Sequence, residues 1–317
     1  RFTLALLPSG LRSEGAVFVF NRIEPALAFR RKGSAAIGLI HTDILRQCVP
    51  GKNEILWARF PRAYARLERW AVGRLDAVFM TSRSVIDRYA GPDPRAGAKL
   101  SLLPNWVDPE IFPVRTVPKS RLREVLRRSH PSLPKEGPWV LFVGRLQPVK
   151  APFRAVDGFR RFLEPGRPGT LIMVGEGNLK PALEDHIRRE GLGSRVFLLG
   201  DRSQAELSLF YRAADVLLLT SHHESMPCSV LESLGSGTPV VATDVGEVRG
   251  VIRDGRSGLI IDGEPEAIAA ALGRVIGSPG VYSPEDCRAC VASNDPRTVL
   301  PQVFDTIREL GHRIRTE

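Results

Sequence analysis

The stretch of residues 222–246, HHESMPCSVLESLGSGTPVVATDVG, constrains the fold and function of this chain more than any other. It follows an apolar strand that we expect over 215–220. A helix is expected to begin near Ser225, with Ser225 as its cap and Pro227 in its first turn. The next buried strand is expected over 238–243. This order places the start of the helix at the carboxyl end of a strand, where ligands bind in doubly wound sheets.

Two carboxylates flank the start of this helix. Glu224 lies on the loop before it, and Glu232 lies within it, with seven residues between them. Free backbone N–H groups at a helix start carry about half a positive charge and hold anions such as phosphate. Carboxylates accept hydrogen bonds from hydroxyls, so the stretch predicts a ligand with phosphates and many hydroxyls, such as a nucleotide sugar. The alternative interpretation is an ordinary loop with two solvated glutamates.

Strands and helices alternate through the second half of the chain. The expected strands span 139–143, 170–174, 195–199, 215–220, 238–243 and 258–261, and the expected helices span 152–162, 179–190, 204–212, 225–235, 246–253 and 265–277. Such alternation predicts a parallel, doubly wound sheet. We assign residues 138–292 to this second, donor-binding domain.

The first half of the chain alternates in the same way. The expected strands span 16–20, 35–40, 77–81 and 99–103, and the expected helices span 25–32, 53–75 and 83–90. Residues 1–110 are therefore a first Rossmann-like domain, and the fold class is α/β with two such domains. The proline-rich residues 111–137, which contain a basic helix over 120–128, are expected to link the domains. A last helix near 297–311, within residues 293–317, is expected to pack back toward the first domain.

Two cations follow the strand over 139–143. Arg145 and Lys150 leave its carboxyl end, on the same edge of the sheet as Glu224. In glycosyl transfer the diphosphate is the leaving group, and fixed cations aimed at its developing charge lower the barrier. The sequence contains no Asp-x-Asp, which argues against a carboxylate-held divalent ion and leaves this work to the two cations. Taken alone, the pair is also consistent with ordinary surface cations.

Composition indicates a globular protein of 317 residues with 43% hydrophobic and 25% charged residues. The net charge of +10 favours polyanionic partners, but no aromatic-interleaved basic stripe or known motif supports nucleic-acid binding. Four cysteines in a chain this long do not form a secreted disulfide framework. Cys287 and Cys290 form a lone CxxC, which we interpret as reduced thiols in a helix of a cytosolic protein.

Several stretches resemble the retaining GT-B glycosyltransferases of family 4. The matching segments are VLFVGRLQPVK (140–150), IMVGEGNLKPALE (172–184), the segment from 210 to 246, DGRSGLIID (254–262), IHTD (40–43) and LLPNWVD (102–108). The resemblance covers nearly the whole chain and is densest over 139–262. It implies a hexosyl transfer from an NDP-sugar, UDP- or GDP-linked, to an acceptor hydroxyl with the anomeric configuration kept. No cofactor or metal is expected beyond this co-substrate.

Carried over by position, the resemblance implies a role for each residue on the donor side. Arg145 and Lys150 hold the donor diphosphate, and Gly144 before them is a further binding residue. Glu224 contacts the hydroxyls of the donor sugar. Glu232 holds the ribose hydroxyls.

Further roles follow from the same resemblance. Ser225, Met226 and Pro227 present the helix N-terminus to sugar and phosphate. His41, in the first domain, assists transfer near the 6-position of the sugar. Arg202 lies near the base. The implied acceptor is a glycan of the cell envelope or of a polysaccharide, in some relatives linked to a lipid.

The sequence departs from the family pattern in three places. The usual first strand and glycine-rich loop are not recognisable, so we expect roughly the first quarter of the N-terminal domain to be missing. Trp106 stands at a turn position that is usually glycine. Residues 246–250, GEVRG, replace a pattern of two glycines followed by a glutamate.

Two other functions remain open. A nucleotide-sugar 2-epimerase shares this fold, and it would release no glycoside and need no acceptor. A catalytically inactive subunit would bind the nucleotide sugar and transfer nothing.

The helix over 53–75 bears on localisation. It has an apolar stripe and the five arginines Arg59, Arg62, Arg66, Arg69 and Arg74. A core-facing stripe with a solvated basic face explains this pattern, and so does a helix that lies on an anionic bilayer. With the basic charge and the lipid-linked acceptors of the family, we predict a cytoplasmic protein with weak attachment to the cytoplasmic membrane face.

Overall fold

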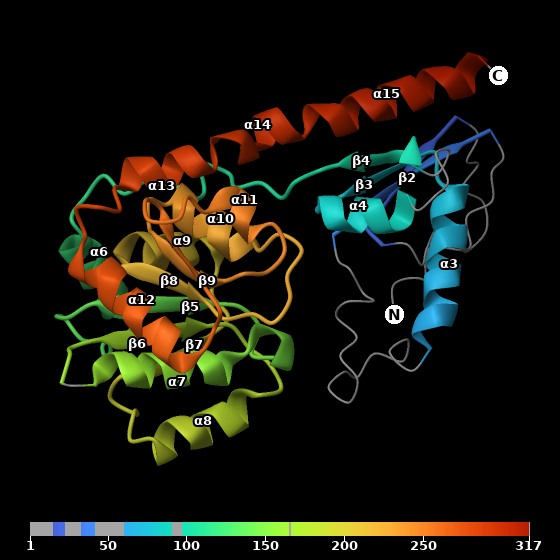
Figure 1. The fold of residues 1–317 in the computed structure, drawn as a ribbon. Helices are drawn as coiled ribbons and strands as arrows, with labels where there is room; N and C mark the ends of the chain where they lie inside the picture. The colour runs from blue at the N-terminus through green and yellow to red at the C-terminus, as the bar shows by residue number, and fades with distance from the viewer. Residues whose placement is uncertain (1–14, 23–32, 42–59, 91–96, 165, 317) are drawn as a thin grey trace. The chain divides into compact units, whose positions relative to one another are not determined.

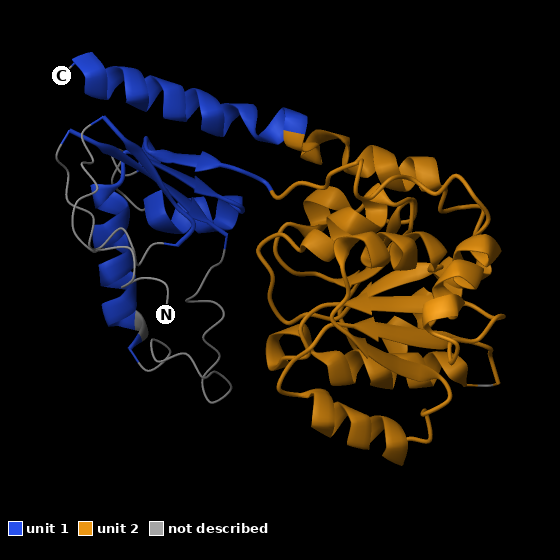
Figure 2. Cartoon of the chain, turned by 180° about the vertical axis from the view of Figure 1, so that it is seen from behind, with its two compact units in different colours: residues 1–104, 297–317 blue, residues 105–296 orange. Residues whose placement is uncertain are grey.

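The computed structural model describes residues 15–22, 33–41, 60–90, 97–164 and 166–316. The chain divides into two compact units, unit 1 with residues 1–104 and 297–317, and unit 2 with residues 105–296 (Figure 2). The helix expected over 25–32, and the beginning of the helix expected over 53–75, lie outside the described residues. Each unit has its own sheet and is described separately.

Unit 2 contains a six-stranded sheet in which all pairings are parallel. The strands are β5 (Trp139–Val143), β6 (Thr170–Val174), β7 (Val196–Gly200), β8 (Val216–Leu219), β9 (Val240–Thr243) and β10 (Gly258–Ile261), in the order β10-β9-β8-β5-β6-β7 (Figure 1). The chain begins in the middle at β5, runs outward to β7, and returns to β8 on the other side. This reversal confirms the doubly wound sheet and puts its switch point between β5 and β8.

Two layers of helices cover the sheet of unit 2 because successive side chains of each strand point to opposite faces. Trp139 and Leu141 of β5 belong to one buried cluster, and Val140 and Phe142 belong to the other. The first face carries α6 (Lys119–Ser129), α9 (Gln204–Ala213), α10 (Cys228–Gly235), α11 (Val248–Val251) and α13 (Pro284–Cys290). The second face carries α7 (Pro152–Leu163), α8 (Lys180–Arg189) and α12 (Pro265–Gly277). The expected helix around Cys287 and Cys290 is α13.

Residues 111–137 differ from the expected linker. They lie in unit 2, and α6 packs against α9. Leu122 and Leu126, one helical turn apart on α6, and Leu133 after it are buried in the core of the sheet's first face. This apolar spacing anchors the segment, although its prolines are typical of an inter-domain connection.

Unit 1 contains four parallel strands that follow one another across the sheet in chain order. They are β1 (Val17–Phe20), β2 (Ala35–Ile40), β3 (Ala77–Met80) and β4 (Leu100–Leu102), with helices α3 (Pro61–Arg74) and α4 (Arg83–Ala90) between them. Tyr64, Ala71 and Leu75 are buried, so the apolar stripe at α3 faces the core. Within the part of the chain that the structure describes, no helix has the length and apolar character needed to cross a membrane.

The last helical segment consists of two helices, α14 (Pro296–Val299) and α15 (Pro301–Thr316), rather than the single helix expected over 297–311. Pro301 starts the second helix because its ring restricts the preceding residue and it lacks an N–H donor. Within unit 1, α15 packs against β1 and β2. Arg313 Nη2 pairs with Asp76 Oδ1 at 2.6 Å, and Gln302 Nε2 donates to Leu102 O at 3.2 Å.

Candidate functional site

The loops after β5, β6 and β7 in unit 2 are joined through their backbones. Leu146 N donates to Glu176 O at 2.9 Å, and Leu179 N donates to Leu146 O at 3.0 Å. The loop after β6 is joined in turn to the end of β7, because Gly175 N donates to Gly200 O at 2.9 Å. These bonds fix the path of the chain where it leaves β5 toward the two predicted cations.

Two glycines make this close backbone packing possible. A Cβ on Gly175 would lie 2.1 Å from Gly144 O, and a Cβ on Gly177 would lie 2.2 Å from Leu146 O. Gly175 also has a φ of +137°, which side-chain-bearing residues rarely adopt. The Gly-Glu-Gly segment is therefore the support on which the loop carrying Arg145 and Lys150 rests.

Lys150 and Glu224 form an ion pair at the carboxyl ends of β5 and β8. Lys150 Nζ lies 2.5 Å from Glu224 Oε1, and Ser221 Oγ donates to the same oxygen at 2.7 Å. The side chains of the lysine and glutamate are only 19% and 12% exposed. Lys150, which is predicted to bind the diphosphate, and Glu224, which is predicted to bind the sugar, are thus brought together. Each side chain offsets the charge of the other.

The backbone under Lys150 is held in a rare conformation. Lys150 ends a 3₁₀ helix, η2 (Pro148–Lys150), and Ala151 follows with φ 48° and ψ 55°. Left-handed backbone at a residue with a Cβ is unfavourable by about 1–3 kcal/mol and persists where surrounding contacts impose it. Thr220 Oγ1 supplies such contacts by sharing its single proton between Lys150 O at 3.1 Å and Ala151 O at 3.0 Å.

Helix α10 begins later than the sequence predicts. Its first residue is Cys228, and Pro227 is the N-cap rather than part of the first turn. The prediction that Ser225 caps the helix is wrong, because the N-cap position falls on Pro227, which makes no side-chain cap hydrogen bond. Pro227 is extended, with ψ 117°, so the helical conformation cannot start before the residue that follows it.

The loop of residues 224–227 is fastened on two sides. Glu247 N donates to Ser225 O at 2.9 Å, and a Cβ on Gly246 would lie 2.2 Å from that same oxygen. On the other side, Asn105 Nδ2 donates to Met226 O at 2.7 Å. Asn294 Nδ2 in turn donates to Asn105 O at 2.7 Å. Sequence reasoning missed this role of Asn105, although its Pro-Asn-Trp-Val-Asp segment was the signal that could have led to it.

Glu232 points from α10 to a buried phenol. Tyr211 OH, on the neighbouring α9, donates to Glu232 Oε2 at 2.7 Å, and Tyr211 is fully buried. Burial raises the pKa of Glu232 above its usual range, and the hydrogen bond from Tyr211 opposes that shift. Tyr211 thus occupies one carboxylate oxygen and orients the other, which the resemblance assigns to ribose hydroxyls.

Replacing Glu232 by glutamine is expected to stabilise the protein progressively as the pH rises. The raised pKa means that the native state holds this proton above pH 4.5, the ordinary value, while the unfolded state has lost it. The contribution of Glu232 to stability is therefore fully present below that pH and lost as pH rises through the folded pKa, whereas glutamine does not titrate. Urea unfolding of both proteins between about pH 4 and pH 7 measures the difference. Glu184→Gln, on an exposed part of α8, is the control, and a difference independent of pH would contradict the prediction.

Arg145, Arg202 and His41 are predicted site residues that are not part of the Lys150–Glu224 ion pair. Arg145 follows Gly144 with an exposed side chain, and across the described ranges no residue pairs with its guanidinium. Arg202 makes its contacts locally, to Asp201 O at 2.7 Å and to a Glu206 oxygen at 3.6 Å. His41 follows β2 in unit 1, and partial burial of its ring lowers its pKa from the ordinary value. Their predicted roles stay predictions.

The arrangement in unit 2 suits an anionic ligand that also carries hydroxyls. Two cations and a helix start can hold phosphate, and the free oxygens of two carboxylates can accept hydrogen bonds from hydroxyls. Over the same described residues, no group of three or more His, Cys, Asp and Glu side chains is arranged to hold a metal ion.

Comparison with known sequences identifies a protein family that the chain matches. The model of the family described as glycosyl transferases group 1 matches residues 125–292. D-inositol 3-phosphate glycosyltransferase of Acidothermus cellulolyticus is 37% identical over 222 residues, which are 67% of this chain and 46% of that protein. The enzyme of the same name from Salinispora tropica is 32% identical over 238 residues, 69% of this chain and 48% of that protein. The chain thus spans about half the length of these curated relatives.

Comparison with solved structures identifies proteins that share the fold of this chain. Sucrose-phosphate synthase from Thermosynechococcus elongatus matches with a TM-score of 0.74 and 21% identity, over 93% of this chain and 73% of that chain. Anabaena Alr3699/HepE in complex with UDP-glucose matches with a TM-score of 0.75 and 21% identity, over 92% and 78%. At these identities the likeness concerns the fold alone.

Proposed function

Because the chain belongs to the glycosyl transferases group 1 family, we propose that it moves a sugar from an NDP-sugar donor to an acceptor hydroxyl. The donor binds at the carboxyl edge of the unit 2 sheet. The observation that carries this proposal is the shielded pair of Lys150 and Glu224 beside the start of α10. It holds a cation that can bind phosphate next to a carboxylate that can accept hydrogen bonds from hydroxyls, which supports binding of a sugar linked to a diphosphate.

The reaction proposed is a retaining, metal-independent transfer. Arg145 and Lys150 take the charge that develops on the leaving diphosphate, and Glu224 orients the hydroxyls of the sugar. Sequence reasoning identifies no carboxylate nucleophile, so the acceptor attacks on the face from which the diphosphate leaves. The departing phosphate then accepts the proton of the acceptor hydroxyl, and His41 assists near the sugar.

Donor and acceptor candidates come from the relatives. One structure of this fold is described in complex with UDP-glucose, so UDP is the first nucleotide to test, followed by GDP. The curated relatives are D-inositol 3-phosphate glycosyltransferases, so inositol 3-phosphate joins glycan and lipid-linked acceptors in the test.

The proposal is tested by thermal unfolding with UDP, GDP, ADP and their sugar conjugates in phosphate-free buffer. A nucleotide at about a hundred times its Kd should raise Tm by roughly 5 °C. Glu232→Ala should lose most of that rise, and Glu184→Ala should keep it. If no nucleotide raises Tm of the parent, the proposed donor site is wrong.

With the stabilising donor, release of nucleoside diphosphate and formation of a glycoside distinguish a transferase from an epimerase or a binding subunit.

We also propose weak attachment of unit 1 to the cytoplasmic membrane face through α3. Phe60, the N-cap of α3, is 60% exposed, and Trp70 on the helix is 53% exposed. Arg62, Arg66 and Arg69 are exposed on the same helix. Exposed aromatic rings among arginines suit an anionic bilayer surface. Three arginine contacts at about 1 kcal/mol each would tighten binding by roughly a hundred-fold.

Sedimentation with anionic liposomes at low salt tests this attachment. The parent should sediment with anionic but not with neutral liposomes, and the triple change of Arg62, Arg66 and Arg69 to glutamine should stay in solution. The triple change of the exposed residues Arg188, Arg249 and Arg308 in other helices controls for net charge. Equal sedimentation of the two triple variants would rule out a specific role for α3.

A further inference from the structure

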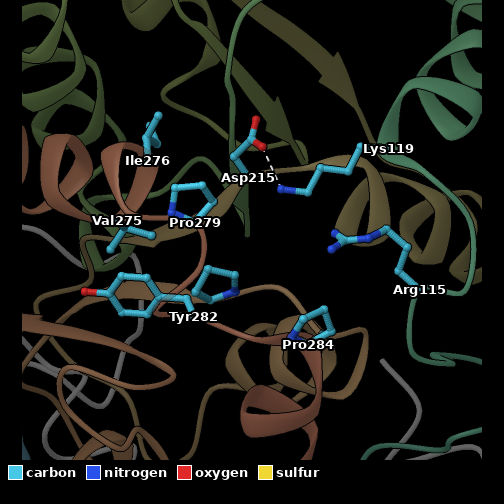
Figure 3. A pocket seen from close by; sticks show the side chains of 10 residues that line it. Arg115, Lys119, Asp215, Val275, Ile276, Pro279, Tyr282 and Pro284 are labelled. Atoms are coloured by element: carbon cyan, nitrogen blue, oxygen red, sulfur yellow. Dashed lines mark hydrogen bonds and ion pairs between the residues drawn. The ribbon is translucent and has the colours of Figure 1, made fainter.

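A cavity lies at the edge of the unit 2 sheet opposite the proposed donor site. Its volume is about 90 Å³, and it opens where Asp215 precedes β8 and Pro239 precedes β9, at the amino ends of these strands (Figure 3). The donor loops follow the carboxyl ends of the same strands. This cavity is therefore separate from the proposed donor site and has no part in the function argued above.

Two of the three cations near this cavity share one carboxylate. Lys119 Nζ lies 2.6 Å from Asp215 Oδ1, and Arg123 Nη2 lies 2.6 Å from Asp215 Oδ2. Trp139 N also donates to Oδ2, at 2.7 Å, so both oxygens of the carboxylate are engaged. Arg115 is the third cation, and it lines the cavity with Lys119. With Glu285, whose charge also acts on Arg115, two negative charges face three positive charges and leave a surplus of one.

Arg123 is used by the fold itself. Its Nε donates to Ala213 O at 3.1 Å and its Nη1 donates to Gly137 O at 2.8 Å, while the guanidinium lies 4.8 Å from the centre of the Trp139 ring. It holds α6 to the sheet, and it does not line the cavity. The surplus charge is therefore presented by the other two cations.

Arg115 has most of its donors free. In the described part of the chain, the hydrogen bond recorded for its guanidinium is a long one, Nη1 to Arg212 O at 3.5 Å. Figure 3 shows the guanidinium of Arg115 and the ammonium of Lys119 directed into the cavity from one side, facing prolines and Tyr282. Partial burial lowers the pKa of Arg115 and of Lys119; Asp215 opposes the shift in each case, and the neighbouring Arg123 adds to it.

The opposite wall is apolar. Pro239, Pro279 and Pro284, with Val275 and Ile276, line it. The wall itself offers no carboxylate. Glu285 on the nearby α13 attracts Arg115, but its side chain is exposed, so solvent screens this attraction. The apolar wall also keeps the local dielectric constant low, which strengthens the attraction of the two cations for an anion.

We propose that this cavity binds an oxyanion, a phosphate ion or the phosphate group of a small monoester, through Arg115 and Lys119. A guanidinium with free N–H groups matches two phosphate oxygens, and the two remaining protons of the ammonium reach a third. Asp215 holds Lys119 in place, and the apolar wall limits the size of the organic group that a bound phosphate monoester can carry. The anion neutralises the surplus charge that the fold leaves at this edge.

Thermal unfolding with inorganic phosphate tests the proposal, at up to about 10 mM and with the ionic strength held constant by NaCl. The parent should show a saturable rise in Tm of roughly 3 °C at ten times Kd. Arg115→Met should abolish the rise. Arg121→Met, which removes an exposed cation from α6, the helix that carries Lys119, should keep it. A parent without a saturable rise, or an unchanged rise in Arg115→Met, overturns the proposal.

A donor-site variant separates the two phosphate-binding edges. Arg145→Ala should retain the phosphate response, because its side chain lies at the carboxyl edge. Loss of the response in Arg145→Ala, with retention in Arg115→Met, would assign the phosphate to the donor site and overturn the proposal. Glycerol 3-phosphate in place of phosphate shows which source fits, since a monoester that binds more weakly than phosphate indicates a site for the free ion.

Folding of the variant does not confuse the result. Arg115 makes one long hydrogen bond, and Arg123 and Lys119 repel it while Asp215 and Glu285 attract it, so Arg115→Met should keep its Tm in phosphate-free buffer. Lys119→Met is the second variant, and it leaves Asp215 paired with Arg123. Its phosphate response should fall at least several-fold, and a full response in Lys119→Met overturns the proposal as well.

Discussion

Lys150→Met is expected to lower kcat/KM for the donor by about 10²- to 10³-fold. In other enzymes, a preorganised hydrogen-bond donor that points at the negative charge developing in the transition state contributes about this much to the rate. The lysine is 19% exposed and sits on backbone that Thr220 holds in place, so its ammonium is fixed before the donor arrives. Release of nucleoside diphosphate from the stabilising donor measures the effect. Lys135→Met, at an exposed lysine elsewhere in unit 2, should change the rate less than two-fold.

A double-mutant cycle with Glu224 separates two explanations for that loss. Removing Lys150 leaves a carboxylate that is 12% exposed with Ser221 as its remaining recorded partner, which is itself unfavourable. If the lysine acts on the diphosphate, Lys150→Met combined with Glu224→Gln should be slower than Glu224→Gln alone by at least ten-fold. Equal rates for these two variants would show that Lys150 serves only to hold Glu224.

Gly175→Ala is expected to destabilise unit 2 by roughly 3 kcal/mol or more. The backbone conformation at φ +137° alone is unfavourable for alanine by about 1–3 kcal/mol. The added methyl group would lie 2.1 Å from Gly144 O, a backbone atom that cannot move without shifting the loop of Arg145 and Lys150. Urea unfolding followed by fluorescence measures the change. Donor binding should fall with it, because the clash is transmitted to that loop.

Two other glycines separate the backbone effect from the clash. Gly191 has a φ of +68° and no atom within 4 Å of an added Cβ, so Gly191→Ala should cost only about 1 kcal/mol. Gly193 has ordinary backbone and equally open space, so Gly193→Ala should leave stability unchanged or raise it slightly. If Gly175→Ala is no worse than Gly191→Ala, the contact with Gly144 does not matter.

The fold of unit 2 could be predicted from the sequence because its strands are buried on both faces. Such strands are continuous apolar runs, and the expected bounds 139–143, 170–174 and 258–261 agree with β5, β6 and β10. Prediction failed where a proline admits two interpretations. The prolines of 111–137 suggested a linker, yet Leu122 and Leu126 tie this segment into the core.

The residues expected to bind the ligand could be predicted from the sequence, whereas the residues that hold them in place could not. Spacing along the chain suggested that Lys150 and Glu224 meet at one edge, and the structure brings them together. Tyr211 and Asn105 could not be found in this way. Their contacts with Glu232 and Met226 depend on which helix packs beside α10 and on where the chain enters unit 2.

The discontinuity of unit 1 has a consequence for synthesis on the ribosome. Residues 105–296 of unit 2 emerge as one unbroken segment, whereas β1 and β2 of unit 1 pack against α15, which lies beyond unit 2 in the chain. At about 5–20 residues per second, roughly 10–40 s separate the end of the first segment of unit 1 from α15. During that time the face of β1 and β2 that α15 covers stays open, while unit 2 has everything it needs to fold. Nascent unit 1, rather than unit 2, is therefore the part that we expect chaperones to hold.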